Sequence, residues 1–88
     1  MLKLAVQIEF DPAKDEANMA KHGVSLARAG DMQVLARLVD VRFEERRLRA
    51  YGLIDGAMFC LAYTLRDGRL RAISLRPARY KEYRRYVP

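Results

Sequence analysis

Residues 46–75, RRLRAYGLIDGAMFCLAYTLRDGRLRAISL, carry the clearest structural signal in this chain. Asp-Gly occurs in this stretch twice, each time between runs rich in aliphatic and aromatic residues. Asp-Gly is the strongest short signal for a two-residue hairpin turn, because both residues adopt positive φ at low cost. The stretch therefore predicts three strands, over 46–54, 57–65 and 69–75, in an antiparallel meander. The run AMFCLAY is nearly all apolar and should lie at the centre of the sheet.

Two further strands and a helix extend this pattern outward. LVDVRF at 38–43 precedes the meander, and LAVQIEF, ending at residue 10, is typical of an opening strand. Pro77 should end the last strand and start a helix, PARYKEYRRY, that runs to residue 86.

Two more helices are predicted between the opening strand and the meander. Asp11 is a good N-cap for a helix over 12–21, and Gly23 suits the left-handed position that ends it. Ser25 can cap a second helix over 26–36. This order of elements is that of an α+β layered domain. We expect a single domain, 1–88, with two N-terminal helices and a C-terminal helix packed on a mostly antiparallel sheet of four to five strands.

Composition indicates a soluble protein, and its charge indicates either a phosphate-rich or acidic partner or only a solvated, arginine-rich surface. The hydrophobic fraction is 51%, and no apolar run approaches the ~20 residues of a membrane span. The N-terminal segment has no signal-peptide pattern, so we expect a cytoplasmic protein without membrane association. The one cysteine, Cys60, should be buried and reduced. The net charge of +6 is concentrated in residues 42–88, which carry twelve basic and five acidic side chains.

One face of the first predicted helix is polar and basic. Lys14, Asn18 and Lys21 are spaced at i, i+4 and i+7, and His22 continues this line at the helix end. Such a face could grip phosphates and supply a proton-transfer group. Equally, Lys21 and His22 could only offset the helix dipole, with Asn18 as a solvated side chain.

The last predicted helix carries a second polar line. Arg79, Glu82 and Tyr86 are spaced at i, i+3 and i+7. Tyr80 and Tyr83 fall on another side, where we expect them to pack on the sheet. Arg79 and Glu82 could alternatively form an exposed ion pair of little energetic weight.

The residue types present narrow the reaction class. The sequence has no ligand spacing for zinc, no Gly-rich phosphate loop and no credible catalytic triad. Arginine, lysine, histidine, glutamate and tyrosine suit metal-free RNA cleavage, in which the ribose 2′-OH attacks the adjacent phosphate. Arg76 lies at a strand–helix junction, and Glu45 and Arg47 would face the same way on a strand. The same residue types could instead bind phosphates without catalysis.

Several separated motifs resemble those of the BrnT family of toxins. FDPAKDEANMAKHGVS at 10–25 looks like the family's opening signature, an aromatic-Asp followed by Lys, Asn and Lys-His-Gly. Glu45-x-Arg47 followed by Gly52 matches its Glu-x-Arg strand. YTLRDGRLRAISLRPAR and RYKEYRRY are similar to its penultimate strand and its basic final helix.

The resemblance implies a RelE-like fold and a ribonuclease toxin of a type II toxin–antitoxin system that inhibits translation. It also implies a BrnA-like ribbon-helix-helix antitoxin as partner and RNA as substrate. Operator DNA would be bound only through the antitoxin complex, which represses its own promoter. No cofactor and no metal are expected.

The resemblance and the helix patterns together nominate candidate site residues. They are His22, Arg47, Arg76, Glu82 and Tyr86 for catalysis, and Lys14, Asn18, Lys21, Glu45, Ser74 and Arg79 for substrate binding. In this hypothesis Arg47 and Arg76 hold the phosphate and stabilise its developing charge. His22 or Glu82 transfers the proton, with Tyr86 as a substitute.

One segment of the sequence departs from the family pattern, and a second functional hypothesis stays open. The segment MQVLARLVDVRF at 32–43 replaces the family's usual Val-Phe-Asp run and longer acidic loop, so this edge should be shaped differently. A second hypothesis, from a different class, is a non-catalytic basic module that acts as partner and co-repressor of a DNA-binding antitoxin. RNA cleavage products distinguish the two.

Overall fold

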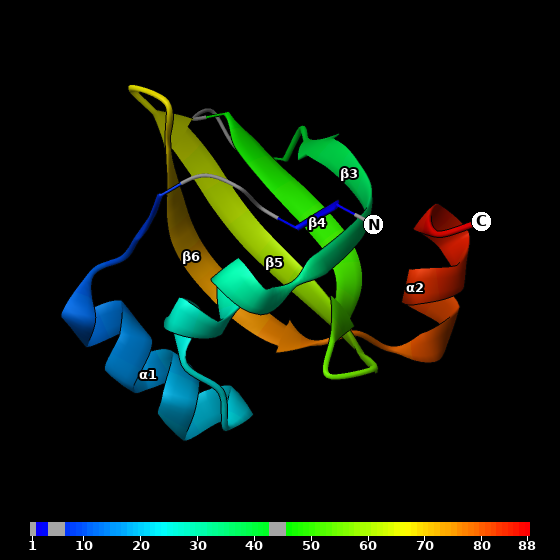
Figure 1. Ribbon diagram of the computed structural model, residues 1–88, viewed down its shortest axis with the longest axis horizontal. Helices are drawn as coiled ribbons and strands as arrows, with labels where there is room; N and C mark the ends of the chain where they lie inside the picture. The colour runs from blue at the N-terminus through cyan, green and yellow to red at the C-terminus, as the bar shows by residue number, and fades with distance from the viewer. Residues whose placement is uncertain (1, 4–6, 43–45) are drawn as a thin grey trace.

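The computed structural model describes residues 2–3, 7–42 and 46–88 (Figure 1). One sheet has the strand order β1-β3-β4-β5-β6-β2. The strands are β1 (Leu2–Lys3), β2 (Ile8–Glu9), β3 (Gln33–Asp40), β4 (Arg47–Ile54), β5 (Ala57–Arg66) and β6 (Arg69–Pro77). The helices are α1 (Pro12–His22), the 3-10 helix η1 (Leu26–Asp31) and α2 (Tyr80–Tyr86). The α+β class and the mostly antiparallel sheet are confirmed, since among the described strands only β2 and β6 pair in parallel.

Both Asp-Gly turns of the predicted meander are confirmed. Asp55 and Gly56 have φ of 50° and 80°, and Asp67 and Gly68 have φ of 51° and 76°. Positive φ at both turn residues gives a twist that matches the flanking strands. β4 pairs antiparallel with β5, and β5 with β6, so the apolar strand β5 lies in the interior of the sheet as predicted.

The sheet has an apolar core on each face. η1 contributes Leu26 and Ala29 to the larger core, which also contains buried residues of β4, β5 and β6. Tyr83 of α2 and Val87, which follows the helix, belong to the smaller core on the other face, together with Tyr51 and Cys60. Cys60 is buried, as predicted. None of the described helices is long and apolar enough to cross a membrane.

The predicted second helix over 26–36 is wrong in its second half. Ser25 caps the segment, but only the 3-10 turn η1 follows, and β3 begins at Gln33. β3 pairs with β4 along its length, and this pairing outweighs a weak helical period that Gly30 already interrupts. The described chain therefore has one N-terminal α-helix where two were predicted. The caps of α1 at Asp11 and Gly23 are confirmed.

The opening strand predicted over 4–10 also differs. Residues 4–6 lie outside the described residues. Ile8–Glu9 pairs in parallel with β6, whereas Leu2–Lys3 pairs with β3 at the opposite edge of the sheet. The sheet therefore has six strands, more than the four to five predicted, because the N-terminal segment adds a short strand to each edge.

The final helix begins later than predicted. β6 extends through Pro77, and the Ala78 N–H donates a hydrogen bond to the Met58 carbonyl over 2.9 Å. This hydrogen bond and the pairing of Pro77 with Phe59 keep the chain extended beyond Pro77, so α2 begins only at Tyr80. Tyr83 is buried as predicted, but Tyr80 is 65% exposed, so the prediction that Tyr80 packs on the sheet was wrong.

A β-bulge in β6 decides which of its side chains face α2. Ala72 and Leu75 both lie in the larger core, although their odd spacing should put them on opposite faces. Ala72 pairs with Tyr63 and Ser74 with the preceding residue of β5, so Ile73 has no partner in the register. This extra residue moves the side chains of Ser74 and of the residues after it, including Arg76, to the opposite face of the sheet from the one that a regular strand would give them.

β3 contains a similar register shift. Val34 packs against the larger core, whereas Ala36 and Leu38 pack against the smaller core beneath α2. The shift lies between Val34 and Ala36. It places Asp40, two residues further on than Leu38, on the same side of the sheet as the α2 core.

Asn18 ties α1 to β6 through its side chain. Asn18 is 5% exposed, and its amide nitrogen donates to the carbonyls of Val24 and Leu75 over 2.9 and 2.8 Å. Its amide oxygen accepts from the Leu75 N–H over 3.0 Å. Asn18 is therefore not the solvated side chain of the alternative prediction. These bonds favour a structural role over the predicted contact with substrate.

We expect Asn18→Ala to lower the free energy of unfolding by about 2 kcal/mol, because it leaves backbone groups of Val24 and Leu75 without partners. Asn18→Asp should also destabilise, because a carboxylate cannot donate to the two carbonyls. Exposed Lys14 on the same helix provides the control, and Lys14→Ala should change stability by less than about 0.5 kcal/mol. Urea unfolding measures all three; an Asn18→Ala protein as stable as wild type would contradict this role.

Gly52 lies where β3 and β4 approach most closely. A Cβ at this position would overlap the carbonyl oxygen of Gln33 and lie 3.0 Å from Met32 Cγ. Backbone atoms cannot move aside as a flexible side chain can. Close packing of β3 against β4 therefore explains why the glycine of the Glu-x-Arg…Gly motif, Gly52, is a glycine.

Candidate active site

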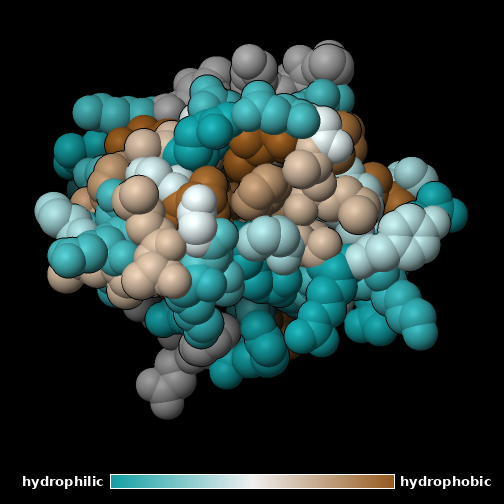
Figure 2. All heavy atoms as spheres, turned by 90° about the horizontal axis from the view of Figure 1, so that it is seen from below, coloured by the Kyte–Doolittle hydropathy of each residue, from teal (hydrophilic) through white to brown (hydrophobic). Residues whose placement is uncertain are grey.

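A cleft of about 680 Å³ is lined by residues of α1, β4, β6 and α2. Its described lining is His22, Arg42, Arg49, Arg76, Pro77, Arg79, Glu82, Arg85 and Tyr86. Five guanidinium groups thus surround one carboxylate, which makes the cleft strongly positive. Figure 2 shows hydrophilic residues gathered over much of the molecule as seen from below, beside a band of apolar residues.

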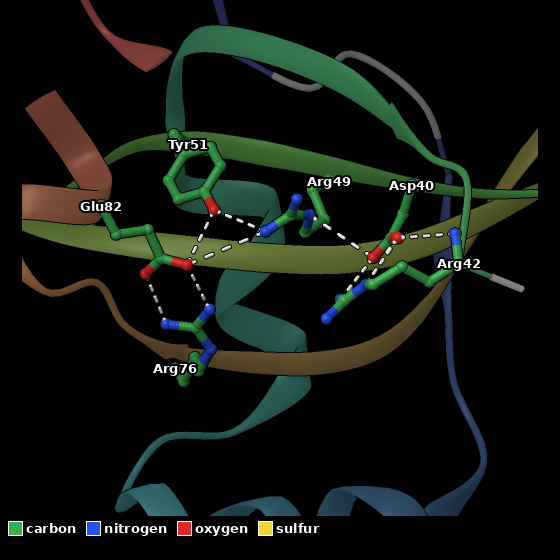
Figure 3. A network of polar contacts seen from close by, with 6 residues as sticks. All are labelled: Asp40, Arg42, Arg49, Tyr51, Arg76 and Glu82. Atoms are coloured by element: carbon green, nitrogen blue, oxygen red, sulfur yellow. Dashed lines mark hydrogen bonds and ion pairs between the residues drawn. The ribbon is translucent and has the colours of Figure 1, made fainter. Parts of the chain in front are cut away.

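Arg76 and Glu82 form a two-point ion pair in this cleft (Figure 3). Arg76 Nη1 and Nη2 donate to Glu82 Oε1 and Oε2 over 2.8 and 2.7 Å. Mainly through these hydrogen bonds, the pKa of Glu82 falls to about 2 and the pKa of Arg76 rises. Both groups stay charged at neutral pH, so Glu82 is a poor proton acceptor. Glu82 pairs with Arg76 and not, as in the alternative prediction, with Arg79.

Tyr51 links this ion pair to Arg49. The Tyr51 hydroxyl donates to Glu82 Oε2 and accepts from Arg49 Nη1, each over 2.9 Å (Figure 3). The Tyr51 ring is fully buried and stacks on Tyr86, with ring centroids 5.0 Å apart. Burial is the main cause that raises the pKa of Tyr51, so its hydroxyl keeps the proton.

Asp40 lies on the other side of Arg49 and is 5% exposed. Its carboxylate accepts from Arg42 Nε and Nη2 over 2.9 and 2.6 Å, and Arg49 Nε lies 3.5 Å from Oδ2. The hydrogen bond from Arg42 is the largest of the causes that lower the pKa of Asp40 to about 2. A continuous polar chain therefore runs Arg42–Asp40–Arg49–Tyr51–Glu82–Arg76 (Figure 3).

His22, at the end of α1, lines the cleft and also a neighbouring hollow of about 300 Å³ that includes Lys14, Lys21 and Ser74. Partial burial, and then the positive charges of Lys21 and Arg76, lower the pKa of His22 below 6.5. The neutral imidazole therefore predominates at pH 7, and this is the form that accepts a proton. His22 is also in the last turn of α1, so its position fits both the predicted proton-transfer role and the alternative role of offsetting the helix dipole.

The structure brings most of the predicted site residues onto one continuous surface. The cleft contains His22, Arg76, Arg79, Glu82 and Tyr86, and the hollow beside α1 contains Lys14, Asn18, Lys21 and Ser74. A third hollow, of about 210 Å³, contains Arg47 and Ser74 and shares Arg42, Arg49 and Arg76 with the cleft. Glu45 lies outside the described residues. Among those that are described, no group of three His, Cys, Asp or Glu side chains could hold a metal ion.

Four charged residues that line these hollows were not predicted from the sequence, namely Asp40, Arg42, Arg49 and Arg85, and neither was buried Tyr51 of the polar chain. Arg49 and Tyr51 follow Arg47 at alternate positions of one strand. Because alternate residues of a strand share a face, they could have been predicted to lie beside Arg47. Asp40 depends on the register shift in β3, which has no signal in the sequence of a single chain.

The fold and the cleft define a small, basic α+β protein suited to a phosphate-bearing ligand. A family model described as "Ribonuclease toxin, BrnT, of type II toxin-antitoxin system" matches residues 10–82. The chain therefore belongs to the BrnT family of ribonuclease toxins. Membership of a type II toxin–antitoxin family implies an antitoxin partner and an RNA substrate.

Among solved structures, the chain is similar to the ribonuclease toxin BrnT of Brucella abortus. The TM-score is 0.65 and the sequence identity 26%, over 85% of this chain and 99% of that chain. No curated protein sequence matches the chain significantly. The family match and the shared fold together confirm the resemblance found in the sequence motifs.

Proposed function

We propose that this chain is a metal-independent endoribonuclease that cleaves RNA by attack of the ribose 2′-OH on the adjacent phosphate. The observation that carries the proposal is that His22, with its lowered pKa, and Arg76 line the same arginine-rich cleft. The family's description as a ribonuclease toxin supports it.

In this reaction His22 accepts the proton of the 2′-OH while the 2′-oxygen forms a bond to phosphorus. The bond between phosphorus and the 5′-oxygen breaks, and the leaving oxygen takes a proton from the hydroxyl of Tyr86, which lines the same cleft. Water then carries the proton from the His22 imidazolium to the Tyr86 phenolate, which restores both groups. The products are a 2′,3′-cyclic phosphate and a free 5′-hydroxyl.

The arginines act on the phosphate in this mechanism. Arg76 stabilises the charge that develops on the phosphate oxygens, and Arg47 supports it from the adjoining hollow. Glu82 fixes the guanidinium of Arg76 through its two hydrogen bonds and does not transfer the proton. The hollow with Lys14 and Lys21 is suited to a flanking phosphate of the same strand.

The finer biological setting follows the family resemblance. In this proposal the toxin has a fold related to RelE-type toxins and inhibits translation by cleaving RNA. A BrnA-like ribbon-helix-helix antitoxin neutralises it. The toxin–antitoxin complex binds operator DNA through the antitoxin and represses its own promoter.

Incubation of the purified, antitoxin-free protein with total RNA in EDTA tests the proposal. We expect fragments that end in a 2′,3′-cyclic phosphate, and we expect an Arg76→Ala protein prepared in parallel to release at least about 100-fold fewer. Cleavage that requires added divalent metal would contradict the metal-free reaction. Absence of cleavage and of growth inhibition on expression would favour the non-catalytic binding module.

A further inference from the structure

We propose that Arg49 is a second phosphate-binding residue of the cleft, and that Tyr51 and Asp40 are positioning residues that aim its guanidinium. The inference rests on the proposed function, because the phosphate is that of the RNA strand. The Glu-x-Arg motif points to Arg47, two residues earlier on β4, so the proposal adds a residue that the motif does not include.

The position of Arg49 on the surface supports its role as a phosphate-binding residue. Arg49 lines both the cleft and the adjoining hollow, as Arg76 does. Arg47 belongs to the described lining of the adjoining hollow and not to that of the cleft. A phosphate in the cleft therefore lies between two guanidinium groups that come from different strands, β4 and β6.

Arg49 is also held in place before any ligand binds. Its side chain is 17% exposed, whereas that of Arg42 in the same cleft is 69% exposed. Three elements fix it: Tyr51 of β4 accepts its hydrogen bond, Asp40 of β3 lies 3.5 Å from its Nε, and the Tyr86 ring centroid of α2 lies 5.5 Å away. A guanidinium already fixed in this way loses little freedom when it binds an anion.

Arg49 also keeps hydrogen-bond donors that no described residue uses. A guanidinium has five N–H donors. Among the described residues, the Tyr51 hydroxyl is the one acceptor of a hydrogen bond from Arg49, and it takes the bond from Nη1. Glu82 Oε2 is 3.8 Å from the same atom, and no described acceptor bonds Nη2. Nε is buried, so the remaining N–H groups of Nη1 and Nη2 are the donors suited to phosphate oxygens.

Tyr51 has a specific part in this arrangement. Its hydroxyl is the atom that joins Arg49 to the Arg76–Glu82 pair, so it sets the two guanidinium groups relative to each other. Tyr51→Phe keeps the buried ring and its stacking on Tyr86, and removes the hydroxyl that joins the two groups. The variant therefore tests positioning without emptying the core.

The first test measures binding of a 2′-O-methyl RNA oligonucleotide, which has no free 2′-OH and is not cleaved. Arg49→Ala is expected to weaken binding about 10-fold and to reduce the salt dependence by about one phosphate contact. Arg49→Lys should restore part of the affinity, since it keeps the charge but not the fork of donors. Arg69, at the far end of β6 near Glu9, provides the control, and Arg69→Ala should bind as wild type does. Wild-type binding by Arg49→Ala would overturn the proposal.

The second test is a double-mutant cycle that separates positioning from general structure. Tyr51→Phe should weaken binding about fivefold in the wild-type background and less than about twofold in the Arg49→Ala background, because it acts through Arg49. Asp40→Asn should behave in the same way. Equal losses in both backgrounds would show that Tyr51 does not act through Arg49. Since binding is measured without cleavage, a wild-type protein that binds but never cleaves would contradict the proposed function and leave this assignment of Arg49 standing.

Discussion

His22→Ala is expected to slow RNA cleavage by about 10²–10⁴-fold, the range that a positioned general base contributes. The substitution removes the neutral imidazole that accepts the 2′-OH proton and leaves the arginines of the cleft in place. Binding of the uncleavable 2′-O-methyl RNA should therefore stay within about twofold of wild type. Single-turnover cleavage and anisotropy on the same samples measure both quantities. Equal cleavage rates for the two proteins would remove His22 from the proton-transfer step.

The direction in which the cleavage rate changes with pH also tests the role of His22 as a base. Below its pKa His22 is protonated and cannot accept a proton, so kcat/KM should rise with pH through a midpoint that lies below 6.5. Lys21→Ala removes one of the charges that lower this pKa, so the midpoint should move upward. A rate that falls with rising pH over the same range would mean that His22 donates the proton instead.

Gly52→Ala is expected to lower the free energy of unfolding by about 3 kcal/mol, at the upper end of overpacking effects. The new methyl group would overlap the carbonyl oxygen of Gln33 and lie 2.9 Å from its carbonyl carbon, both in the backbone of β3. Relief requires β3 to move away from β4, and this disturbs the ladder that ends at Asp40 and Arg47. Urea unfolding measures the loss.

Gly30 in η1 provides the matched control for this substitution. A Cβ at Gly30 would meet only Ile8 Cγ1 at 3.9 Å, which is ordinary van der Waals contact. Gly30→Ala should therefore leave stability within about 0.5 kcal/mol of wild type or raise it slightly. If Gly30→Ala and Gly52→Ala destabilised equally, the loss could not be assigned to the close approach of β3 and β4.

The parts of the fold that could be predicted from the sequence are those with a local physical cause. Asp-Gly favours the tight turns at 55–56 and 67–68, and the cap residues Asp11 and Gly23 act within a few residues of themselves. The errors arose where distant pairing decides the conformation. Residues 33–36 were predicted as the end of a helix but belong to β3, which pairs with β4, and the N-terminal segment divides between two edges of the sheet.

The candidate site was predictable in its helical parts and not in its strands. Helical spacing and the family motifs identified His22 and Glu82. The face of a strand residue, however, depends on the register, and one unpaired residue reverses it. The unpaired positions are Ile73 in β6 and Leu35 in β3. The contact of Asp40 with Arg49, and the pairing of Glu82 with an arginine of β6, could therefore not be predicted from the sequence.

The way α2 is attached has a consequence for the timing of activity during synthesis. A helix of seven residues is too short to be stable alone, and α2 docks through Glu82 and Tyr83 and through Val87, the residue after it. In chain order it follows every strand of the sheet, so the ribosome exposes Arg49 and Arg76 before Glu82 and Tyr86. When only the strands have left the ribosome, the cleft therefore lacks the residues that α2 contributes to its lining. In the proposed toxin, the ability to cut RNA arises only after the ribosome has released the segment that contains α2.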